Sequence, residues 1–247
     1  MIRYKITVEY DGTNLLGWQR QLDGPSVQEH LEDALFAFSG TKTEVSGAGR
    51  TDAGVHALKQ VAHFDLEKEW DTFRLREAYN AHLRLREAPV SVLEVEKVSN
   101  DFHARFSAKG RGYIYRILNR KAPPALEKNR LWWVPFPLDV EKMRQGAQYL
   151  LGHHDFTSFR AVACQAKSPI KTLDKLDISQ QGDEIIFTVE ARSFLHHQVR
   201  NMVGTLKEVG DGKRQPEDIK TILEAKDRKA AGSTAPACGL YLNKVEY

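Results

Sequence analysis

The chain has 247 residues, of which 41% are hydrophobic and 28% charged, and its formal net charge is +3. This length fits one large domain or two smaller ones, with a core that needs neither disulfides nor metal for stability. No apolar run approaches the ~18 residues of a membrane helix, and the N-terminal sequence lacks the architecture of a signal peptide. The spacing of Cys164 and Cys238 fits neither a disulfide framework nor a zinc motif, so we expect a cytoplasmic protein without a membrane segment.

Positive charge is concentrated in one part of the sequence. Residues 101–130 contain eight Lys and Arg residues against only Asp101 and Glu127. Such a local excess is typical of a surface that binds a polyanion such as nucleic acid. A solvated basic loop explains the stretch equally well, so the charge by itself leaves both interpretations open.

The N-terminal part of the chain follows the order β-α-β-β-α-β. Alternating apolar residues predict a half-buried strand over 2–10. A capping box formed by Ser26 and Glu29 opens a helix with an apolar stripe, and Asp71 can cap a second helix. The remaining predicted strands lie near 43–48, at about 58–66 and over 89–98.

The rest of the chain repeats this order in pattern, although not in identity. The expected strands lie at 111–119, 169–178 and 184–191, with a turn at Gln181-Gly182-Asp183 between the last two, and a further strand ends the chain. The expected helices are one from Val140 to Leu151 with Gly152 as C-cap, one over 195–209 ended by Gly210, and a short one that starts at Pro216. Two split β-α-β units in tandem predict an α+β fold of two ferredoxin-like halves with mainly antiparallel sheet. We place the N-terminal half at 1–104 and the C-terminal half at 105–247.

Residues 47–57, GAGRTDAGVHA, place Arg50, Asp52 and His56 among three glycines in the connection between two predicted strands. Connecting loops carry function disproportionately, and glycine lets the backbone approach a ligand closely. A dinucleotide-binding motif is excluded because its sixth position is Asp52 and a strand follows. An aspartate among glycines is often a simple turn former, but with Arg50 nearby it also offers a carboxylate to chemistry and a guanidinium to phosphate or base.

Two histidine pairs and one arginine need separate interpretations. His153-His154 and His196-His197, the second pair early in a predicted helix, cannot easily face one metal because adjacent helical residues point about 100° apart. We therefore predict no metal site. Arg200 lies beside the apolar stripe of its helix, where it is either solvated or directed into a cleft; in a cleft it needs a carboxylate partner, because an unpaired buried charge is costly.

Five segments carry a resemblance to a known family. They are VEYDGTNLLGWQRQ, GAGRTDAGVHALKQVAHF, FSAKGRGYIYRI, FLHHQVRNMVGTL and TAPACGLYL. With these segments in family order, the chain from residue 4 to its C-terminus resembles the tRNA pseudouridine synthase A family, whose members isomerise uridines at positions 38–40 in the anticodon arm of tRNA. One departure is Leu15-Leu16, which stands where the family often has an aromatic residue after DGT.

The resemblance implies catalytic roles for three residues. Asp52 matches the essential aspartate, Tyr113 the active-site tyrosine that stacks on the uracil, and Arg200 the arginine that pairs with the aspartate. The reaction breaks the N1–C1′ bond, turns the uracil and joins C5 to C1′. A single carboxylate can attack the base, attack the sugar or assist proton abstraction, and the sequence leaves all three open.

The resemblance also implies a set of binding residues. Arg50 matches a residue that helps to displace the target base, and Leu240 an apolar residue of the uracil pocket; His56 and Arg111 complete the predicted substrate- and RNA-binding set. The expected partner is tRNA, bound in a cleft between the two halves, and the expected assembly is a homodimer. Because the isomerisation is redox-neutral, we expect no cofactor.

Two other functions stay open at this point. A non-catalytic RNA-binding or RNA-folding protein on the same scaffold would bind tRNA without turnover. A metal-dependent hydrolase that uses the histidine pairs would lose its activity to chelators. The presence of Asp52, Tyr113 and Arg200 favours the synthase over the first alternative, and the histidine spacing disfavours the second.

Overall fold

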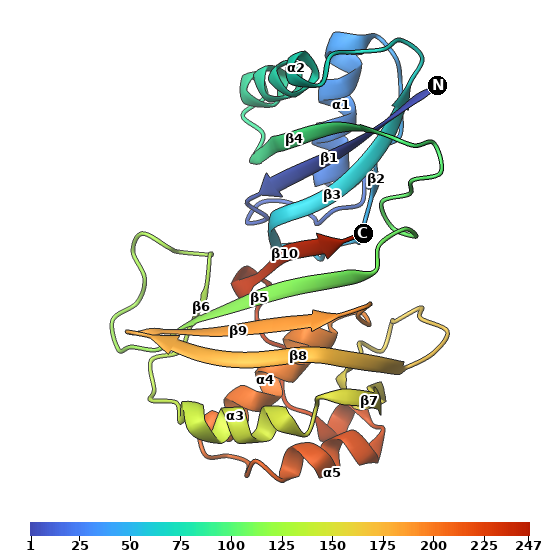
Figure 1. Cartoon of the computed structure of the whole chain (residues 1–247). Helices are drawn as coiled ribbons and strands as arrows, with labels where there is room; N and C mark the ends of the chain where they lie inside the picture. The colour runs from blue at the N-terminus through green and yellow to red at the C-terminus, as the bar shows by residue number, and fades with distance from the viewer. The chain divides into compact units, whose positions relative to one another are not determined.

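The computed structural model describes all 247 residues, which form two compact units (Figure 1). The first unit comprises Met1–Lys109 together with Tyr241–Tyr247, and the second comprises Gly110–Leu240. None of the helices has both the length and the apolar character needed to cross a membrane. The class is α+β with mainly antiparallel sheet, as predicted.

The sheet of the first unit is built around three long strands. β1 (Ile2–Tyr10) lies between β3 (His56–Leu66) and β4 (Val90–Val98), and both pairings are antiparallel. The two-residue strand β2 (Ser46–Gly47) pairs antiparallel with β3. The last strand of the chain, β10 (Leu240–Glu246), pairs with β3 in parallel.

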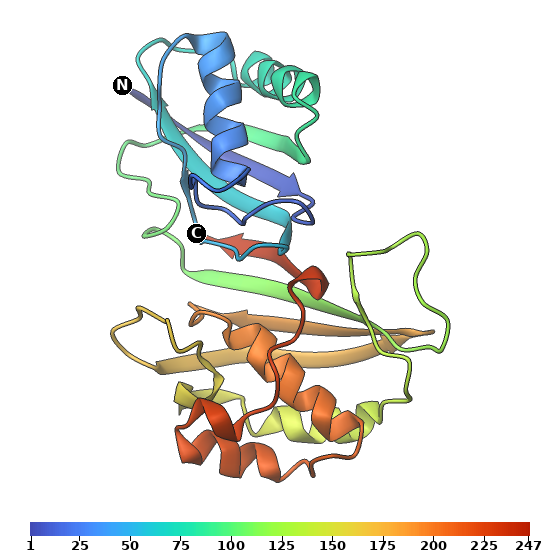
Figure 2. The same ribbon diagram turned by 180° about the vertical axis from the view of Figure 1, so that it is seen from behind.

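Two helices complete the first unit. Figure 2 shows α1 (Val27–Ser39) and α2 (Thr72–Leu85) side by side on one face of the sheet. Both begin as predicted, because the Ser26 hydroxyl accepts a hydrogen bond from the Glu29 N–H and the Asp71 carboxylate accepts one from the Arg74 N–H. Their apolar faces join the sheet residues in one core, which includes Tyr4, Leu31, Leu35, Phe64, Leu75 and Tyr79.

The second unit has a sheet of the order β5-β9-β8-β7. These strands are Gly110–Leu118, Glu184–Ala191, Ile170–Gln181 and Gly152–Asp155, and all three pairings are antiparallel. The short strand β6 (Trp132–Trp133) pairs with β5 in parallel. The turn between β8 and β9 lies where it was predicted, and Gly182 adopts a positive φ of 59° there.

Helices cover one face of this second sheet. α3 (Val140–Gln148) packs against α4 (Gln198–Gly210) and β8, and α5 (Asp218–Ala225) contacts α3 (Figure 2). Three short 3-10 turns, Thr157–Phe159, Arg228–Ala230 and Ala237–Gly239, connect these elements. The buried core includes Tyr115, Met143, Phe187, Val199, Met202 and Leu206.

Several element boundaries differ from the sequence prediction. α3 ends at Gln148, and Gly152, which was predicted as its C-cap, instead begins β7 with a φ of 95°. His196 and His197 precede α4 and do not lie within it, because His197 is the N-cap in a left-handed conformation. Gly152 pairs with Leu173 of β8 and so belongs to the sheet.

The division of the chain also differs from the predicted one at its C-terminal end. The sequence pattern assigned all of 105–247 to one half, but the structure groups Tyr241–Tyr247 with the first unit. The reason is the parallel pairing of Tyr241 with His56 and of Leu242 with Ala57. This pairing joins segments that are far apart in sequence, and no local pattern signals it.

Candidate functional site

The loop that carries Asp52 is fixed by hydrogen bonds at its ends and at its centre. The Ala48 N–H donates to the Val61 carbonyl at 2.7 Å, and the Gln60 side-chain amide donates to the Gly49 carbonyl at 2.9 Å. The Thr51 hydroxyl is buried and shares a hydrogen bond of 2.8 Å with the Tyr10 hydroxyl. Asp52 itself is half-buried, so a tightly held backbone presents a carboxylate at the surface of the first unit.

A second loop, residues 11–18, supports the Asp52 loop from behind. The Trp18 N–H donates to the Thr51 carbonyl at 3.1 Å, and the Gly54 N–H donates to the Leu15 carbonyl at 3.3 Å. The Leu15 side chain is buried, whereas that of Leu16 is exposed. The Leu15-Leu16 pair, which departs from the family pattern, thus belongs to the supporting loop.

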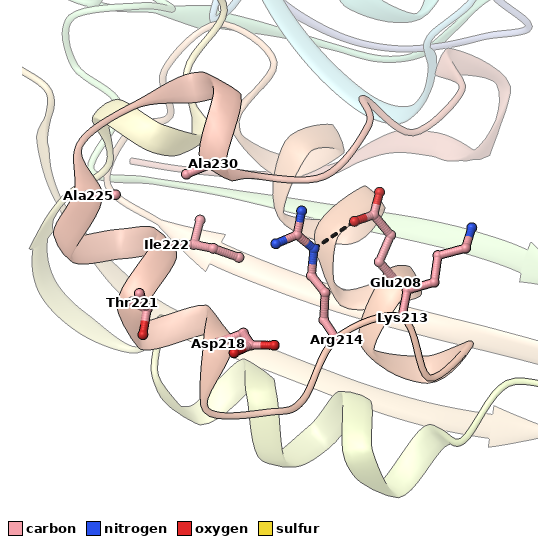
Figure 3. Close-up of a pocket in the computed structure, with 8 residues that line it drawn as sticks. All are labelled: Glu208, Lys213, Arg214, Asp218, Thr221, Ile222, Ala225 and Ala230. Carbon is pink, nitrogen blue, oxygen red and sulfur yellow. Dashed lines mark hydrogen bonds and ion pairs between the residues drawn. The ribbon is translucent and has the colours of Figure 1, made fainter.

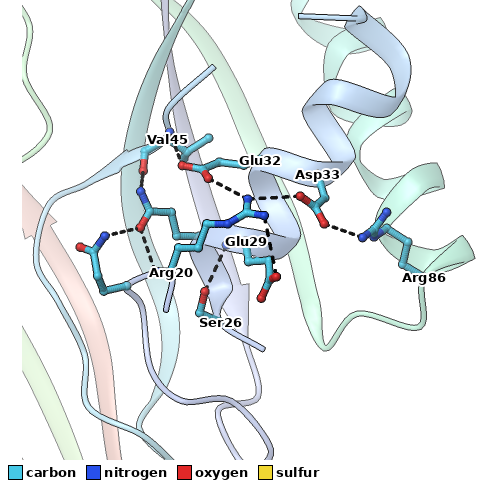
Figure 4. A network of polar contacts seen from close by, with 9 residues as sticks. Arg20, Ser26, Glu29, Glu32, Asp33, Val45 and Arg86 are labelled. Atoms are coloured by element: carbon cyan, nitrogen blue, oxygen red, sulfur yellow. Dashed lines mark hydrogen bonds and ion pairs between the residues drawn. The ribbon is translucent and has the colours of Figure 1, made fainter. Parts of the chain in front are cut away.

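The N-terminus of α1 anchors the supporting loop. The Gln28 N–H donates to the Trp18 carbonyl at 3.0 Å, and its side chain accepts from the Arg20 N–H at 3.0 Å while donating to the Val45 carbonyl at 3.3 Å. The Arg20 guanidinium lies within 4 Å of three carboxylates on α1, those of Glu29, Glu32 and Asp33 (Figure 4). Arg86 also binds the Asp33 carboxylate. Gln28 thus ties the supporting loop and the strand that leads to Asp52 to the same helix end. The sequence analysis did not single it out, and a polar residue in the first turn gave no signal for this role.

We expect Gly17→Ala to destabilise the first unit and to reduce the activity of the chain. Gly17 has a φ of 95°, and a Cβ there would lie 2.3 Å from the Thr51 carbonyl oxygen. The left-handed conformation and the steric overlap together should cost at least about 2 kcal/mol, which lowers the Tm by about 5 °C or more. Gly49→Ala is the matched control, because nothing lies within 4 Å of its Cβ position. Equal melting temperatures for the two variants would contradict this account.

His56 supports the Asp52 loop from the interior. Its side chain is only 2% exposed, its Nδ1 accepts a hydrogen bond from the Gly12 N–H at 3.0 Å, and its ring stacks on Tyr241 at 4.7 Å. Asp11 Oδ1 also lies 3.2 Å from Nδ1, but that oxygen already accepts from the Thr13 N–H. Nδ1 therefore lies against both the Gly12 backbone and the Asp11 carboxylate. The RNA contact of His56 stays a prediction, for a side chain that is buried in this unit, whereas Arg50 is exposed.

In the second unit, Arg200 is tied to the segment that leads to the last strand. Its Nε donates to the Ala235 carbonyl at 2.8 Å, and the Ala235 N–H donates back to the Arg200 carbonyl at 3.1 Å. Arg200 is half-buried at the start of α4. Because Nε is fixed in this way, the backbone at Ala235 restricts the orientation of the guanidinium.

Tyr115 holds the same segment from the other side. Its ring is buried on β5, its hydroxyl donates to the Pro236 carbonyl at 2.8 Å, and a Cβ on Gly239 would lie 2.6 Å from Tyr115 Cζ. Burial raises the pKa of Tyr115 well above its ordinary value, so the hydroxyl stays a donor. Leu240 follows this clamp directly and is 6% exposed. Tyr115 was not among the predicted site residues, although it lies two positions after Tyr113 on the same strand face.

We expect Tyr115→Phe to lower turnover about 5- to 10-fold without changing the affinity for tRNA. The variant keeps the ring that packs on Gly239 and removes only the hydrogen bond to Pro236, which contributes about 1 kcal/mol. The segment that contacts Arg200 and leads to Leu240 then loses one of the hydrogen bonds that fix it. Steady-state kinetics and a binding titration would separate the two quantities, with Tyr149→Phe in the same unit as control. A rise in KM at unchanged kcat would contradict this positioning role.

The remaining predicted residues of the second unit occupy β5. Tyr113 is half-buried and makes an edge-to-face contact with Phe194 at 5.2 Å. Arg111 is half-buried, and its guanidinium donates to the Arg192 carbonyl at 2.8 Å, so it closes over the end of β9. Tyr113, Arg111, Arg200 and Leu240 thus belong to the second unit, whereas Arg50, Asp52 and His56 belong to the first.

A separate open pocket of about 510 Å³ lies between α4 and α5 (Figure 3). None of the predicted site residues lines it. Its charged groups compensate one another, because Arg214 Nε donates to a Glu208 oxygen at 2.7 Å. The Ser233 N–H donates to the other Glu208 oxygen, so both oxygens of this carboxylate are engaged within the second unit.

Comparison with known proteins identifies the family. The tRNA pseudouridine synthase family model matches residues 6–107 and 147–247. Proteins named tRNA pseudouridine synthase A from Paramagnetospirillum magneticum and Sinorhizobium fredii are 58% and 53% identical over the whole chain, which covers 96% and 100% of their lengths. A chain of a solved Cbf5-Nop10-Gar1 complex aligns with 97% of this chain at 11% identity and a TM-score of 0.39, and this chain spans about half (48%) of its length.

The chain therefore belongs to the tRNA pseudouridine synthase family, which is a family of isomerases that act on tRNA. The predicted resemblance is confirmed. The matched residues include Asp52, Arg200 and Leu240, whereas Tyr113 and Arg111 fall in the unmatched segment 108–146.

Proposed function

We propose that this synthase isomerises uridine to pseudouridine at positions 38–40 of the tRNA anticodon stem-loop, with Asp52 as its essential carboxylate. The observation that carries the proposal is the way in which Asp52 is held. Its loop is hydrogen-bonded to β3, to Tyr10 and to the supporting loop, and yet the carboxylate side chain is only half-buried. Such a rigid loop supplies the preorganisation that catalysis requires.

The chemistry needs a positioned carboxylate more than any other group. The N1–C1′ bond breaks and a C5–C1′ bond forms within one nucleoside, so no electron acceptor is consumed. We assign Asp52 to the reacting nucleoside, Tyr113 to the face of the uracil, and Arg200 to the electrostatic support of the reaction. Leu240 provides an apolar contact for the base.

Binding of the RNA is assigned to cationic side chains. A base in the anticodon stem must leave its stack before an enzyme can act on it, at a cost of a few kcal/mol. Phosphate contacts from the basic residues of 101–130, with Arg50 and Arg111, offset this cost and make binding sensitive to salt. His56 contributes indirectly, through the loop that it supports. We extend the proposal to a homodimer in the cytoplasm. Sedimentation of the purified protein would test the dimer.

Release of tritium tests the proposed reaction directly. Isomerisation must free the hydrogen at C5 of the target uridine, so tRNA transcribed with uridine tritiated at C5 reports turnover whatever the attack mechanism. Transcripts that keep uridine at only one of positions 38, 39 and 40 would assign the target. We expect release from transcripts that retain uridine at these positions and none when all three are cytidine. A folded protein that binds every transcript without release would instead support the non-catalytic alternative.

A further inference from the structure

The turn that follows β4 presents an aromatic side chain to solvent. Phe106 is 77% exposed, although hydrogen bonds hold its backbone. The Ser107 N–H donates to the His103 carbonyl at 2.9 Å, and the His103 ring Nδ1 accepts from the N–H groups of Arg105 and Phe106 at 3.1 and 3.4 Å. The exposed ring therefore projects from a closed hydrogen-bonded turn and not from a loose loop.

This turn is fixed to the interior of the first unit. The Ala104 N–H donates to His63 Nδ1 at 3.3 Å, and the Tyr247 hydroxyl donates to the Ala104 carbonyl at 2.8 Å. Burial lowers the pKa of His63, which keeps its ring neutral and able to accept. Ala104 also packs with Ala48 and Val61 in one small apolar cluster. Ala48 opens the Asp52 loop, so the turn and the catalytic loop share a rigid base.

The rings of His63, His103 and Phe106 follow one another from the interior to the surface. The ring of His63 lies 4.5 Å from that of His103, which lies 4.4 Å from that of Phe106. The Arg105 guanidinium stands 5.7 Å from the centroid of Phe106. An aromatic face on a rigid support beside an arginine is the arrangement on which proteins stack nucleobases.

The charge around the turn favours RNA over an apolar partner. Within the first unit, residues 102–109 contain two cationic side chains, Arg105 and Lys109, and no acidic one. A polyanion that also carries flat ring faces matches both this charge and the exposed ring.

We propose that Phe106 is a stacking platform for an unpaired nucleobase of the tRNA, distinct from the uridine that reacts at Asp52. The proposal rests on the proposed function only in taking tRNA as the ligand. Because the turn and the Asp52 loop share the cluster of Ala48, Val61 and Ala104, a base held on Phe106 fixes the register of the RNA relative to the catalytic carboxylate.

The chain offers a matched control on α2. Phe73 is 62% exposed, and the Arg76 guanidinium stands 5.3 Å from its ring centroid. Arg76 is bound by Glu77 at 3.1 Å, and the surrounding segment 67–77 carries acidic residues among its basic ones. The Phe73–Arg76 pair therefore lies in a segment whose acidic and basic residues offset one another, and we expect it not to bind RNA.

Equilibrium binding of unmodified tRNA transcript to the full chain tests the platform. We expect Phe106→Ala to raise the Kd about 10-fold, Phe106→Trp to restore it to within about twofold, and Phe73→Ala to leave it unchanged. Activity should follow as a higher KM at unchanged kcat. Wild-type affinity of Phe106→Ala, or failure of Phe106→Trp to restore binding at a normal Tm, would overturn the proposal.

Abasic substitution of the RNA identifies the stacked base. If one position contacts Phe106, removal of that base should weaken wild-type binding about 10-fold and should not weaken the binding of Phe106→Ala further. Additive losses at every unpaired position would overturn the proposal. These results are independent of turnover, so a chain that bound tRNA without isomerising it would refute the proposed reaction and leave this test readable.

Discussion

Asp52→Ala is expected to reduce tritium release by at least about 10³-fold, the upper part of the range over which a positioned proton-transfer or nucleophilic side chain acts. Affinity for tRNA and the Tm should stay close to those of the wild-type protein. The physical reason is that the loop is held by its backbone and by Thr51, with Asp52 contributing its own carbonyl to a bond from the Val55 N–H. An alanine preserves every one of these bonds.

Two further variants sharpen this result. Asp52→Asn keeps the shape of the side chain and removes its charge, so equal losses for Asn and Ala would assign the effect to the carboxylate. Asp101→Ala is the control, because Asp101 is an exposed aspartate of the same unit. A large fall in the Tm of Asp52→Ala would make the residue structural, and near wild-type release would remove it from the reaction.

Arg200→Ala should lose about 100-fold in turnover, and Arg200→Lys should lose clearly less. Alanine removes the charge and also the hydrogen bond from Nε to the Ala235 carbonyl. Lysine keeps the positive charge but has a single terminal nitrogen. That nitrogen cannot both donate to the Ala235 carbonyl and place its charge at the reaction site, whereas arginine has separate donors for the two interactions. An intermediate rate for lysine would therefore show that both functions of the guanidinium contribute.

Two controls separate the role of Arg200 from a loss of stability and from the loss of any one positive charge. Lys220→Ala removes an exposed cation from α5 of the same unit and should leave kcat unchanged. The backbone bond from the Ala235 N–H to the Arg200 carbonyl persists in all variants, so the Tm should fall by only a few degrees. Equal, wild-type-like rates for alanine and lysine would exclude Arg200 from the site.

Local sequence rules predicted most elements of the fold. The capping residues Ser26 and Asp71 lie where the helices begin, and both side chains make the expected hydrogen bonds. Gly182 takes the positive φ of the predicted turn, and the alternation over 2–10 gives a strand with those bounds. These features depend on a few neighbouring residues, so a single sequence contains the information.

The sequence was less informative about how the candidate residues are supported. The glycines of the supporting loop could be seen in the sequence, but not that a Cβ on Gly12 would lie 2.1 Å from the Val55 carbonyl oxygen. Likewise, Tyr115 has the alternation of an ordinary strand residue. Its contact with Pro236 joins residues 121 positions apart, which no periodicity indicates.

By itself, the sequence determined the α+β class, the order of most elements, the glycine loop around Asp52 and, through five segments, the family. The tertiary structure alone decided that β10 pairs with β3, that His56 supports the loop from inside, and that the rigid turn 103–107 exposes Phe106. The reason is physical. Capping, alternation and turn chemistry act over a few residues, whereas burial and strand partnership depend on which distant segment occupies the neighbouring space.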